Sequence, residues 1–299
     1  MKRKKPVGEI VADVLFHVIM VLLALSCILP FINVLAISFS SRNAAIAGNV
    51  GLFPVEPTIL SYKYLMRDDQ FFKSFLVSFK RIILGVPYNM LMILFTAYPL
   101  SKSKEQFRGR QIYIWIVVFT MLFSGGLVPT YMVIKEVGLM GTFWALIIPG
   151  GVLVWNIILM MNFFRSVPAA LEEAAFVDGA GYIRTLFIIY IPLSLPAMAT
   201  IGLFTAVAQW NAWFDGLIYL SDPNTYPLST YIYTMVNQMS QALDGARVAD
   251  PEMLRYLDKI SDKTIRCAQV FLGALPILMV YPFLQKYFMS GIKLGAVKE

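Results

Sequence analysis

The chain contains few of the residues that soluble enzymes use for chemistry. Its 299 residues include one histidine, His17, and two cysteines, Cys27 and Cys267, and only 14% are charged. No HExxH pattern occurs and no cysteines or histidines cluster, so a metal enzyme is not expected and no metal ligand is predicted. The serines have no credible histidine partner, and no catalytic residue is predicted.

Two further absences narrow the function. The chain has no GxxxxGK[ST] phosphate loop, so we do not expect it to be an ATPase of that type. Its apolar segments are nearly free of ionisable residues, which ion-coupled carriers place at membrane depth. The net charge of +7 forms no basic stripe with interleaved aromatic residues, so nucleic acid is not an expected partner. A positive charge fits anionic membrane lipid instead.

Apolar residues are abundant. The chain is 58% hydrophobic with a mean hydropathy of +0.68, whereas soluble domains carry about 25% charged residues. A membrane span needs about 20 apolar residues, and in lipid such a span must be a helix. Six stretches meet or approach that length: Val14 to Ser41, Ile82 to Ser101, Gln111 to Ile134, Val137 to Arg165, Leu186 to Phe214 and Cys267 to Gln285. We predict an all-α integral membrane protein with six transmembrane helices.

Basic residues orient these spans. Met1 to Lys5 holds four basic residues, and the apolar run after it is longer than the 7–15 residues of a signal peptide. We read this run as a retained first span with the N-terminus in the cytoplasm. Six spans then place the C-terminus in the cytoplasm as well. The predicted inner segments hold thirteen of the 25 basic residues and the outer segments twelve, so the total does not decide the orientation. The orientation depends on the N-terminus and on the loop Lys102 to Arg110, which has four basic residues in nine.

The expected organisation follows from these spans. Residues 1–13 form a cytoplasmic N-terminus, 14–70 the first span and an outer loop, 71–291 the core with five spans, and 292–299 a cytoplasmic tail. Within the outer segment 216 to 266, Ser229 to Leu243 and Pro251 to Arg266 have helical character.

The most informative stretch is 172 to 196, which lies between two charge-free segments. Ser166 and Pro168 precede the helix formers Ala169 to Ala175, and such residues suit a helix start. Gly179 and Gly181 suit a helix end or tight turn. A second helical run, Tyr182 to Ile191, leads to the next span. The pattern predicts a short helix, a glycine turn and another helix, a shape suited to docking into a partner.

These residues also resemble a known family. The order Glu173-Ala174-Ala175, three residues, Gly179, nine residues and Ile189-Tyr190-Ile191-Pro192 resembles the EAA loop of ABC import permeases. Here the loop covers 165–191, and Ile191 replaces the usual Leu. Asp178 before Gly179 is similar to the carbohydrate-importer version. The segment from Tyr281 to Phe288 and the tail after it resemble the last helix and tail of the same group.

The resemblance implies a sugar or oligosaccharide permease of the type I ABC importer fold, closest to the lipoprotein and complex-polysaccharide group. It implies that the loop docks on an ATPase through six residues: Glu172, Glu173, Ala174, Ala175, Asp178 and Gly179. The implied partners are two ATPase subunits, a different permease polypeptide and an extracytoplasmic solute-binding protein. No cofactor is expected in this chain, because ATP and Mg belong to the ATPase. The implied location is a prokaryotic cell membrane.

Polar residues near the spans carry further hypotheses. The end of the fifth span holds Gln209, Trp210, Asn211 and Trp213, a possible substrate path because amides bond sugar hydroxyls and rings stack on sugar faces. Tryptophan at a membrane interface is the simpler interpretation. Lys80 and Arg81 are expected to snorkel to the interface, although they could line a polar vestibule. Asn156 and Asn162 are expected to bond between helices.

Two other classes of protein stay open at this point. One is a secondary carrier or channel without an ATPase, in which replacing Glu173 and Gly179 would leave transport intact. The other is a membrane scaffold or sensor subunit, which would assemble normally without moving sugar. Within the ABC class, a peptide or amino acid is an alternative cargo.

Overall fold

The structure is a computed structural model that describes residues 7–67, 69–244, 259–276 and 278–279. Within these residues it is helical, with no β-strand, as the apolar composition predicts. The chain divides into two compact units, Met1–Asp69 with Thr234–Leu275 and Gln70–Tyr233 with Pro276–Glu299. Each unit is described by itself.

The first unit begins with a long apolar helix. α1, Val7–Ser38, exposes large hydrophobic side chains along most of its length, as a helix facing lipid does. Two short helices follow in the predicted outer loop, α2 (Arg42–Ile46) and α3 (Leu60–Arg67). Tyr64 and Leu65 of α3 pack against Ile260, Ile265 and Ala268.

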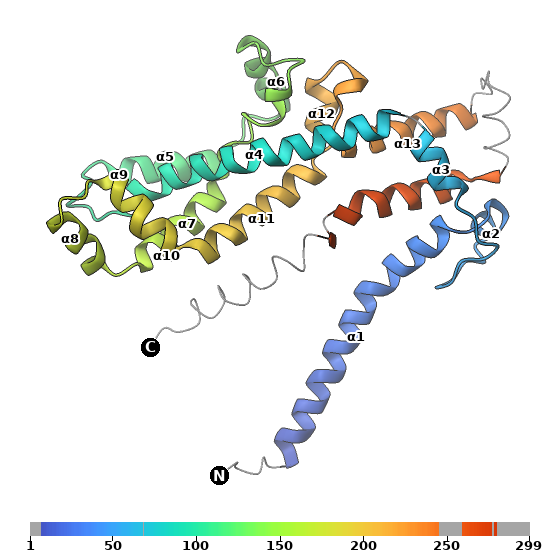
Figure 1. Cartoon of the computed structure of the whole chain (residues 1–299), viewed down its shortest axis with the longest axis horizontal. Coiled ribbons are helices and arrows are strands. Elements are labelled where there is room, and N and C mark those ends of the chain that lie inside the picture. Colours follow the sequence, from blue (N-terminus) through green and yellow to red (C-terminus); the bar gives the residue numbers. More distant parts are fainter. Residues whose placement is uncertain (1–6, 68, 245–258, 277, 280–299) are drawn as a thin grey trace. The chain divides into compact units, whose positions relative to one another are not determined.

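The second unit is a helical bundle. In chain order its helices are α4 (Asp69–Ser101), α5 (Arg110–Leu122), α6 (Leu127–Glu136), η1 (Phe143–Leu146), α7 (Val154–Ser166), α8 (Ala169–Val177), α9 (Tyr182–Thr185), η2 (Leu186–Tyr190), α10 (Ile191–Leu193), α11 (Leu195–Asn211), α12 (Phe214–Tyr219) and η3 (Pro223–Thr225). In Figure 1, α4, α5, α7 and α11 run alongside one another, with α8 at one end of this bundle and α12 at the other. The core lies between α4, α7, η2 and α11. α13, Leu228–Asp244, follows.

Within the described residues, two of the predicted spans are single long helices. α1 and α4 are long and apolar enough to cross a membrane, and the number rises to five only if three bent helix pairs each count as one span. The stretch Gln111 to Ile134 is broken by 116° between α5 and α6, because Gly126 adopts φ +84° there. Six spans therefore remain a prediction.

The other stretches differ from the prediction in similar ways. Helix α7 starts only at Val154, after a segment that contains Pro149 and two glycines. The fifth stretch bends by 83° between α10 and α11 at Ser194, next to Pro196. Of the sixth stretch, residues 267–276 are helical. The rest of that stretch lies largely outside the described residues. Of Pro251 to Arg266, residues 251–258 lie outside them and residues 262–266 are helical.

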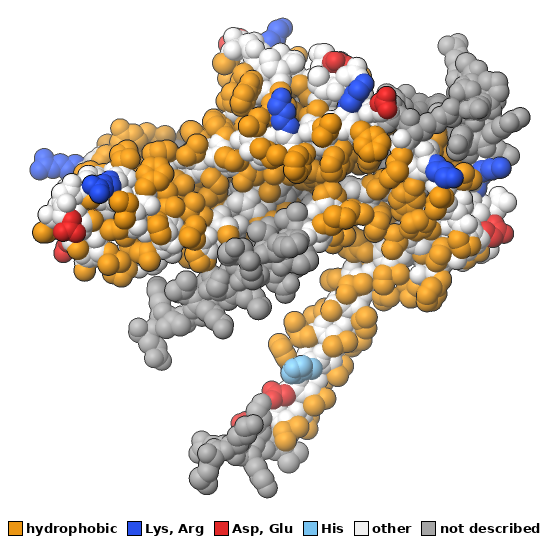
Figure 2. All heavy atoms as spheres, viewed as in Figure 1, with side chains coloured by type: hydrophobic (Ala, Val, Ile, Leu, Met, Phe, Trp, Pro, Cys, Tyr) orange, Lys and Arg blue, Asp and Glu red, His pale blue; other side chains and the backbone are white. Residues whose placement is uncertain are grey.

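The surface of the second unit separates apolar from charged side chains. Figure 2 shows hydrophobic side chains over its visible flank and charged ones near the end that carries α8 and α9 and in the region of α6 and α12. Helix α5 exposes Ile112, Trp115, Ile116 and Phe119 and has no buried residue. A flank of this kind is stable in hydrocarbon, with the charged end in water.

Candidate functional site

The predicted helix–turn–helix of the EAA loop is present. α8 spans Ala169–Val177 and starts after Pro168, as expected. The hydroxyl of Ser166 donates instead to the Phe163 carbonyl and so belongs to the end of α7. The second helical run is also present, with one turn of π-helix at Leu186–Tyr190.

Gly179 closes α8 with a specific hydrogen-bond pattern. Its N–H donates to the Phe176 carbonyl at 3.0 Å, and the Ala180 N–H donates to the Ala175 carbonyl at 2.9 Å. This is a Schellman motif, which needs a left-handed residue at the first position past the cap. Gly179 has φ +79°, whereas Gly181 has φ −81°. Of these two positions, only position 179 has a backbone angle that favours glycine.

The two glutamates of the loop have opposite environments. Glu172 is 5% exposed, whereas Glu173 is exposed to solvent. The Lys102 ammonium donates to Glu172 Oε1 at 2.7 Å, and the Tyr190 hydroxyl donates to Glu172 Oε2 at 2.6 Å. Glu172 therefore ties α8 to the end of α4 and to η2.

Aromatic rings complete the surroundings of this ion pair. The Lys102 ammonium lies 4.0 Å from the centre of the Tyr98 ring and 4.1 Å from that of Tyr190. These rings and Phe164 form an edge-to-face cluster with centroids 5.0 to 6.1 Å apart. Burial lowers the pKa of Lys102, and the hydrogen bond to Glu172 opposes that shift. The two cation–π contacts and the carboxylate together compensate the burial of the ammonium.

Two arginine side chains also donate hydrogen bonds to the end of α4. Arg110 Nε donates to the Leu100 carbonyl at 2.9 Å, and Arg165 Nη2 donates to the same oxygen at 3.4 Å. Cations are favourable at a helix C-terminus, where carbonyls are unpaired. Lys102 and Arg110 of the predicted inner loop therefore also stabilise the end of α4, against which α8 is held.

The remaining face of α8 is free of such contacts. Ala174 and Leu171 are exposed, and Val177 is 88% exposed at the tip of the helix. Asp178 is also exposed and contributes its backbone N–H to the end of α8. Ala175 is half-buried. Of the six predicted coupling residues, the structure places Glu172 inward, Gly179 in the turn, and Glu173, Ala174 and Asp178 at the surface.

The structure places the four residues of the predicted substrate path in different surroundings. Gln209 lines a cavity in the second unit. Trp210 is buried and packs edge-to-face on Phe75, with ring centroids 5.8 Å apart. Trp213 stacks on Tyr233 at 3.9 Å, and Asn211 is exposed. The structure therefore brings one of the four residues, Gln209, to the cavity.

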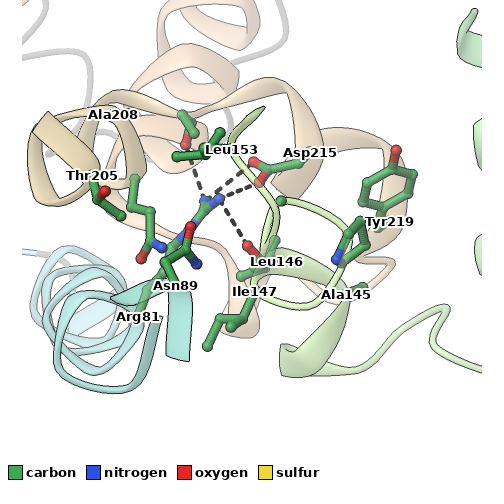
Figure 3. Close-up of a pocket in the computed structure, with 14 residues that line it drawn as sticks. Arg81, Asn89, Ala145, Leu146, Ile147, Leu153, Thr205, Ala208, Asp215 and Tyr219 are labelled. Atoms are coloured by element: carbon green, nitrogen blue, oxygen red, sulfur yellow. Dashed lines mark hydrogen bonds and ion pairs between the residues drawn. The ribbon is translucent and has the colours of Figure 1, made fainter. Parts of the chain in front are cut away.

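The prediction that Arg81 snorkels to an interface is wrong. Arg81 is 3% exposed and forms an ion pair with Asp215. Its Nη2 also donates to the Leu146 carbonyl at 3.0 Å (Figure 3). Sequence reasoning missed this pair, because its members lie 134 positions apart. Lys80 remains exposed and lies 4.6 Å from the centre of the Phe143 ring.

Other polar residues follow expectation in part. Asn156 Nδ2 donates to Thr205 Oγ1 at 3.4 Å and so joins α7 to α11, as predicted. Asn162 is exposed. Cys27 and Cys267 are both free thiols.

Apolar flanks, a charged end with a projecting short helix, and a pocket lined in part by polar side chains are typical of an α-helical membrane transport protein. Comparison with known proteins specifies the class. The chain is 37% identical over 286 residues to the polygalacturonan/rhamnogalacturonan transport system permease protein YtcP of Bacillus subtilis, covering 96% of this chain and 98% of the relative. It is 36% identical over 271 residues to LplC of the same organism, covering 91% and 89%. The chain belongs to the family of ABC transporter sugar permeases.

A solved structure agrees with this assignment. A chain of a bacterial ABC transporter involved in the import of the acidic polysaccharide alginate matches with a TM-score of 0.83 and 30% identity, over 96% of this chain and 100% of that one. No protein-family model matches the chain. The resemblance of the sequence to ABC sugar permeases is confirmed. The alternatives of a secondary carrier, a channel and a scaffold subunit are therefore excluded.

Proposed function

We propose that this protein is the permease subunit through which an ATP-driven importer moves oligosaccharides of an acidic polysaccharide into the cytoplasm. The names of its relatives support this substrate class. YtcP is named for polygalacturonan and rhamnogalacturonan, and the matching solved chain belongs to an alginate importer. All three of these polysaccharides contain uronic acid units. An oligosaccharide cargo also agrees with the sequence, which favours sugar over peptide.

The projecting face of α8 is the proposed contact with the ATPase. Glu172 holds one side of the helix against the bundle, which leaves Glu173, Ala174 and Val177 exposed on the other. An exposed apolar side chain beside a carboxylate suits a helix that enters a groove of a partner. Small Ala174 permits close approach, and the Glu173 carboxylate provides a polar contact. This exposed face is the observation that carries the proposal.

The proposed complex contains two ATPase subunits, a second and different permease, and an extracytoplasmic solute-binding protein. ATP and Mg bind to the ATPase subunits. A second similar structure is a bacterial alginate ABC transporter in complex with an alginate pentasaccharide-bound periplasmic protein, and it supports the solute-binding protein as a partner. We place the complex in the cell membrane of a prokaryote, with both termini of this chain in the cytoplasm.

The cycle follows from these contacts. The binding protein delivers sugar to the outer mouth, and ATP closes the ATPase pair. α8 moves with the ATPase, and the Glu172–Lys102 ion pair transmits that motion to α4. The bundle then turns from inward-open to outward-open, and hydrolysis resets it.

Replacing Glu173 by lysine is expected to release the ATPase from an otherwise intact permease. Reversing the charge of an interfacial group that is exposed in this chain weakens docking without unfolding the bundle. The measurement is purification of tagged protein in mild detergent, followed by mass spectrometry of its partners. The parent chain should recover an ATPase and a second permease, and the variant only the permease.

Glu105→Lys is the matched control, because Glu105 is exposed on the neighbouring loop, outside α8. It should keep the ATPase. Recovery of the ATPase with Glu173→Lys in undiminished amount would remove α8 as the docking element. Recovery of the parent chain alone, under conditions that preserve other membrane complexes, would contradict the proposed assembly.

A further inference from the structure

A polar cavity lies inside the second unit, away from the EAA loop. Its volume is about 320 Å³, and α4, the segment from Ala145 to Leu153, α11 and α12 line it. Ligand pockets range from about 300 to 1,000 Å³, so this cavity is at the small end of that range. Figure 3 shows Arg81, Asn89 and Asp215 gathered at its centre with Thr205 and Tyr219 at its sides.

Three polar atoms of this lining have no hydrogen-bond partner among the described residues. They are Arg81 Nε, Asn89 Oδ1 and Gln209 Oε1. Asn89 is 1% exposed, and its Nδ2 donates to the Gly85 carbonyl at 3.0 Å. A buried polar atom without a partner is destabilising. Three of them around one cavity are groups that a bound molecule or water would satisfy.

Gly85 makes the approach of Gln209 possible. A Cβ at position 85 would lie 2.2 Å from Gln209 Oε1, which is far inside contact distance. The amide of Gln209 on α11 can therefore reach the face of α4 that carries Arg81 and Asn89 only because residue 85 has no side chain. The sequence supplies both the polar group and the space that it needs.

The charges in the cavity balance. The Arg81 guanidinium is paired with Asp215, and its two terminal nitrogens also donate to the Ala212 and Leu146 carbonyls. A ligand carboxylate would meet Asp215 as well as Arg81, and it would gain little over its hydration. The buried atoms of the lining that remain unpaired among the described residues are one N–H donor and two amide oxygens. This set suits neutral hydroxyl groups, which both donate and accept hydrogen bonds.

We propose that this cavity binds one ring of the transported oligosaccharide through its hydroxyl groups. Asn89 Oδ1 and Gln209 Oε1 accept from sugar hydroxyls, Arg81 Nε donates to a sugar oxygen, and Pro149, Leu153 and Tyr219 give the cavity its apolar walls. The site selects for sugar hydroxyls and not for the acid group. The inference rests on the proposed function, since it assumes that a sugar crosses here.

A cysteine at the cavity mouth gives a direct test. Ala208 lines the cavity and is exposed. In a chain with Cys27→Ser and Cys267→Ser, Ala208→Cys supplies a single thiol, and its reactivity measures access to the cavity. The complete complex, with its binding protein, is trapped during ATP hydrolysis. A methanethiosulfonate reagent is then added, and the rate at which it modifies the cysteine is measured. A galacturonic acid trisaccharide and a neutral galactose trisaccharide, each supplied with a binding protein that carries it, should both slow modification by about fivefold or more, because the site recognises hydroxyl groups. An unchanged rate with both sugars would overturn the proposal.

A second variant tests the role of the amide. Asn89→Leu keeps the volume and removes the acceptor, so sugar imported per ATP hydrolysed should fall about fivefold or more, with ATP hydrolysis within about twofold of the parent. Asn162→Leu, the same change at an exposed position of α7, should leave the ratio unchanged. An unchanged ratio in Asn89→Leu, with the complex assembled, would overturn the site. A parent complex that imports neither trisaccharide would instead contradict the proposed function.

Discussion

Replacing Lys102 by methionine is expected to abolish import, leaving less than about a tenth of the parent activity. The change removes one partner of a buried ion pair and leaves the Glu172 carboxylate in a site that is 5% exposed. Breaking such a pair costs about 3–5 kcal/mol. We expect α8 to leave its position against α4, because Glu172 is then better solvated outside the bundle. The measurement is ATP-driven sugar uptake by the reconstituted complex.

Two further variants separate this cause from general damage. The double variant Lys102→Met with Glu172→Gln leaves no buried charge, and the new amide still accepts from Tyr190. It should recover about half of the parent uptake or more, because removing both charges is far less costly than removing one. Lys104→Met, an exposed cation of the same loop, should have little effect. A double variant no better than Lys102→Met would refute the ion pair as the anchor of α8.

Gly179→Val is expected to produce the second large loss, with transport uncoupled from ATP hydrolysis. Residue 179 has φ +79°, and a left-handed angle costs a β-branched residue about 1–2 kcal/mol or more. No atom lies within 4 Å of a Cβ built there, so the effect comes from backbone strain and not from collision. The Schellman bonds of the turn break, and α8 changes its direction relative to α9. Uptake and sugar-stimulated ATP hydrolysis, measured together, report the change.

The chain itself offers the controls. Gly179→Asn should retain most of the uptake, because asparagine tolerates the left-handed region. Gly181→Ala should be nearly silent, since Gly181 has φ −81° and open space around it. Normal sugar-stimulated ATP hydrolysis in Gly179→Val would exclude the turn as part of the coupling path. A similar loss in Gly181→Ala would point to the flexibility of the whole loop instead.

The sequence predicted the local features of the loop well. Helix formers between Pro168 and Gly179 became α8, and Gly179 became its left-handed end. These features depend on neighbours within a few residues, which a linear pattern contains. The same pattern treated Glu172 and Glu173 as equivalent coupling residues. Their difference arises from Lys102 and Tyr190, which reach the loop from 70 and 18 positions away.

The polar cavity was the least predictable feature. Arg81 was expected to snorkel, and Gln209 was grouped with three neighbours of which none lines the cavity. A membrane helix turns its side chains through a full circle every 3.6 residues, so adjacent residues point in different directions. Which of them face the interior depends on the packing of α4 against α11.

By itself, the sequence determined that this protein is an α-helical membrane permease of the ABC sugar transporter family, and it predicted a docking loop. Hydrophobic runs, basic flanks and the EAA spacing are local properties, and they survive any arrangement of the helices. The tertiary structure alone decided the breaks within three apolar stretches, the inward and outward glutamates of the loop, and the site that joins Arg81, Asn89 and Gln209. Those features need side chains from distant helices to meet, because a buried charge or amide is stable only where its partners converge.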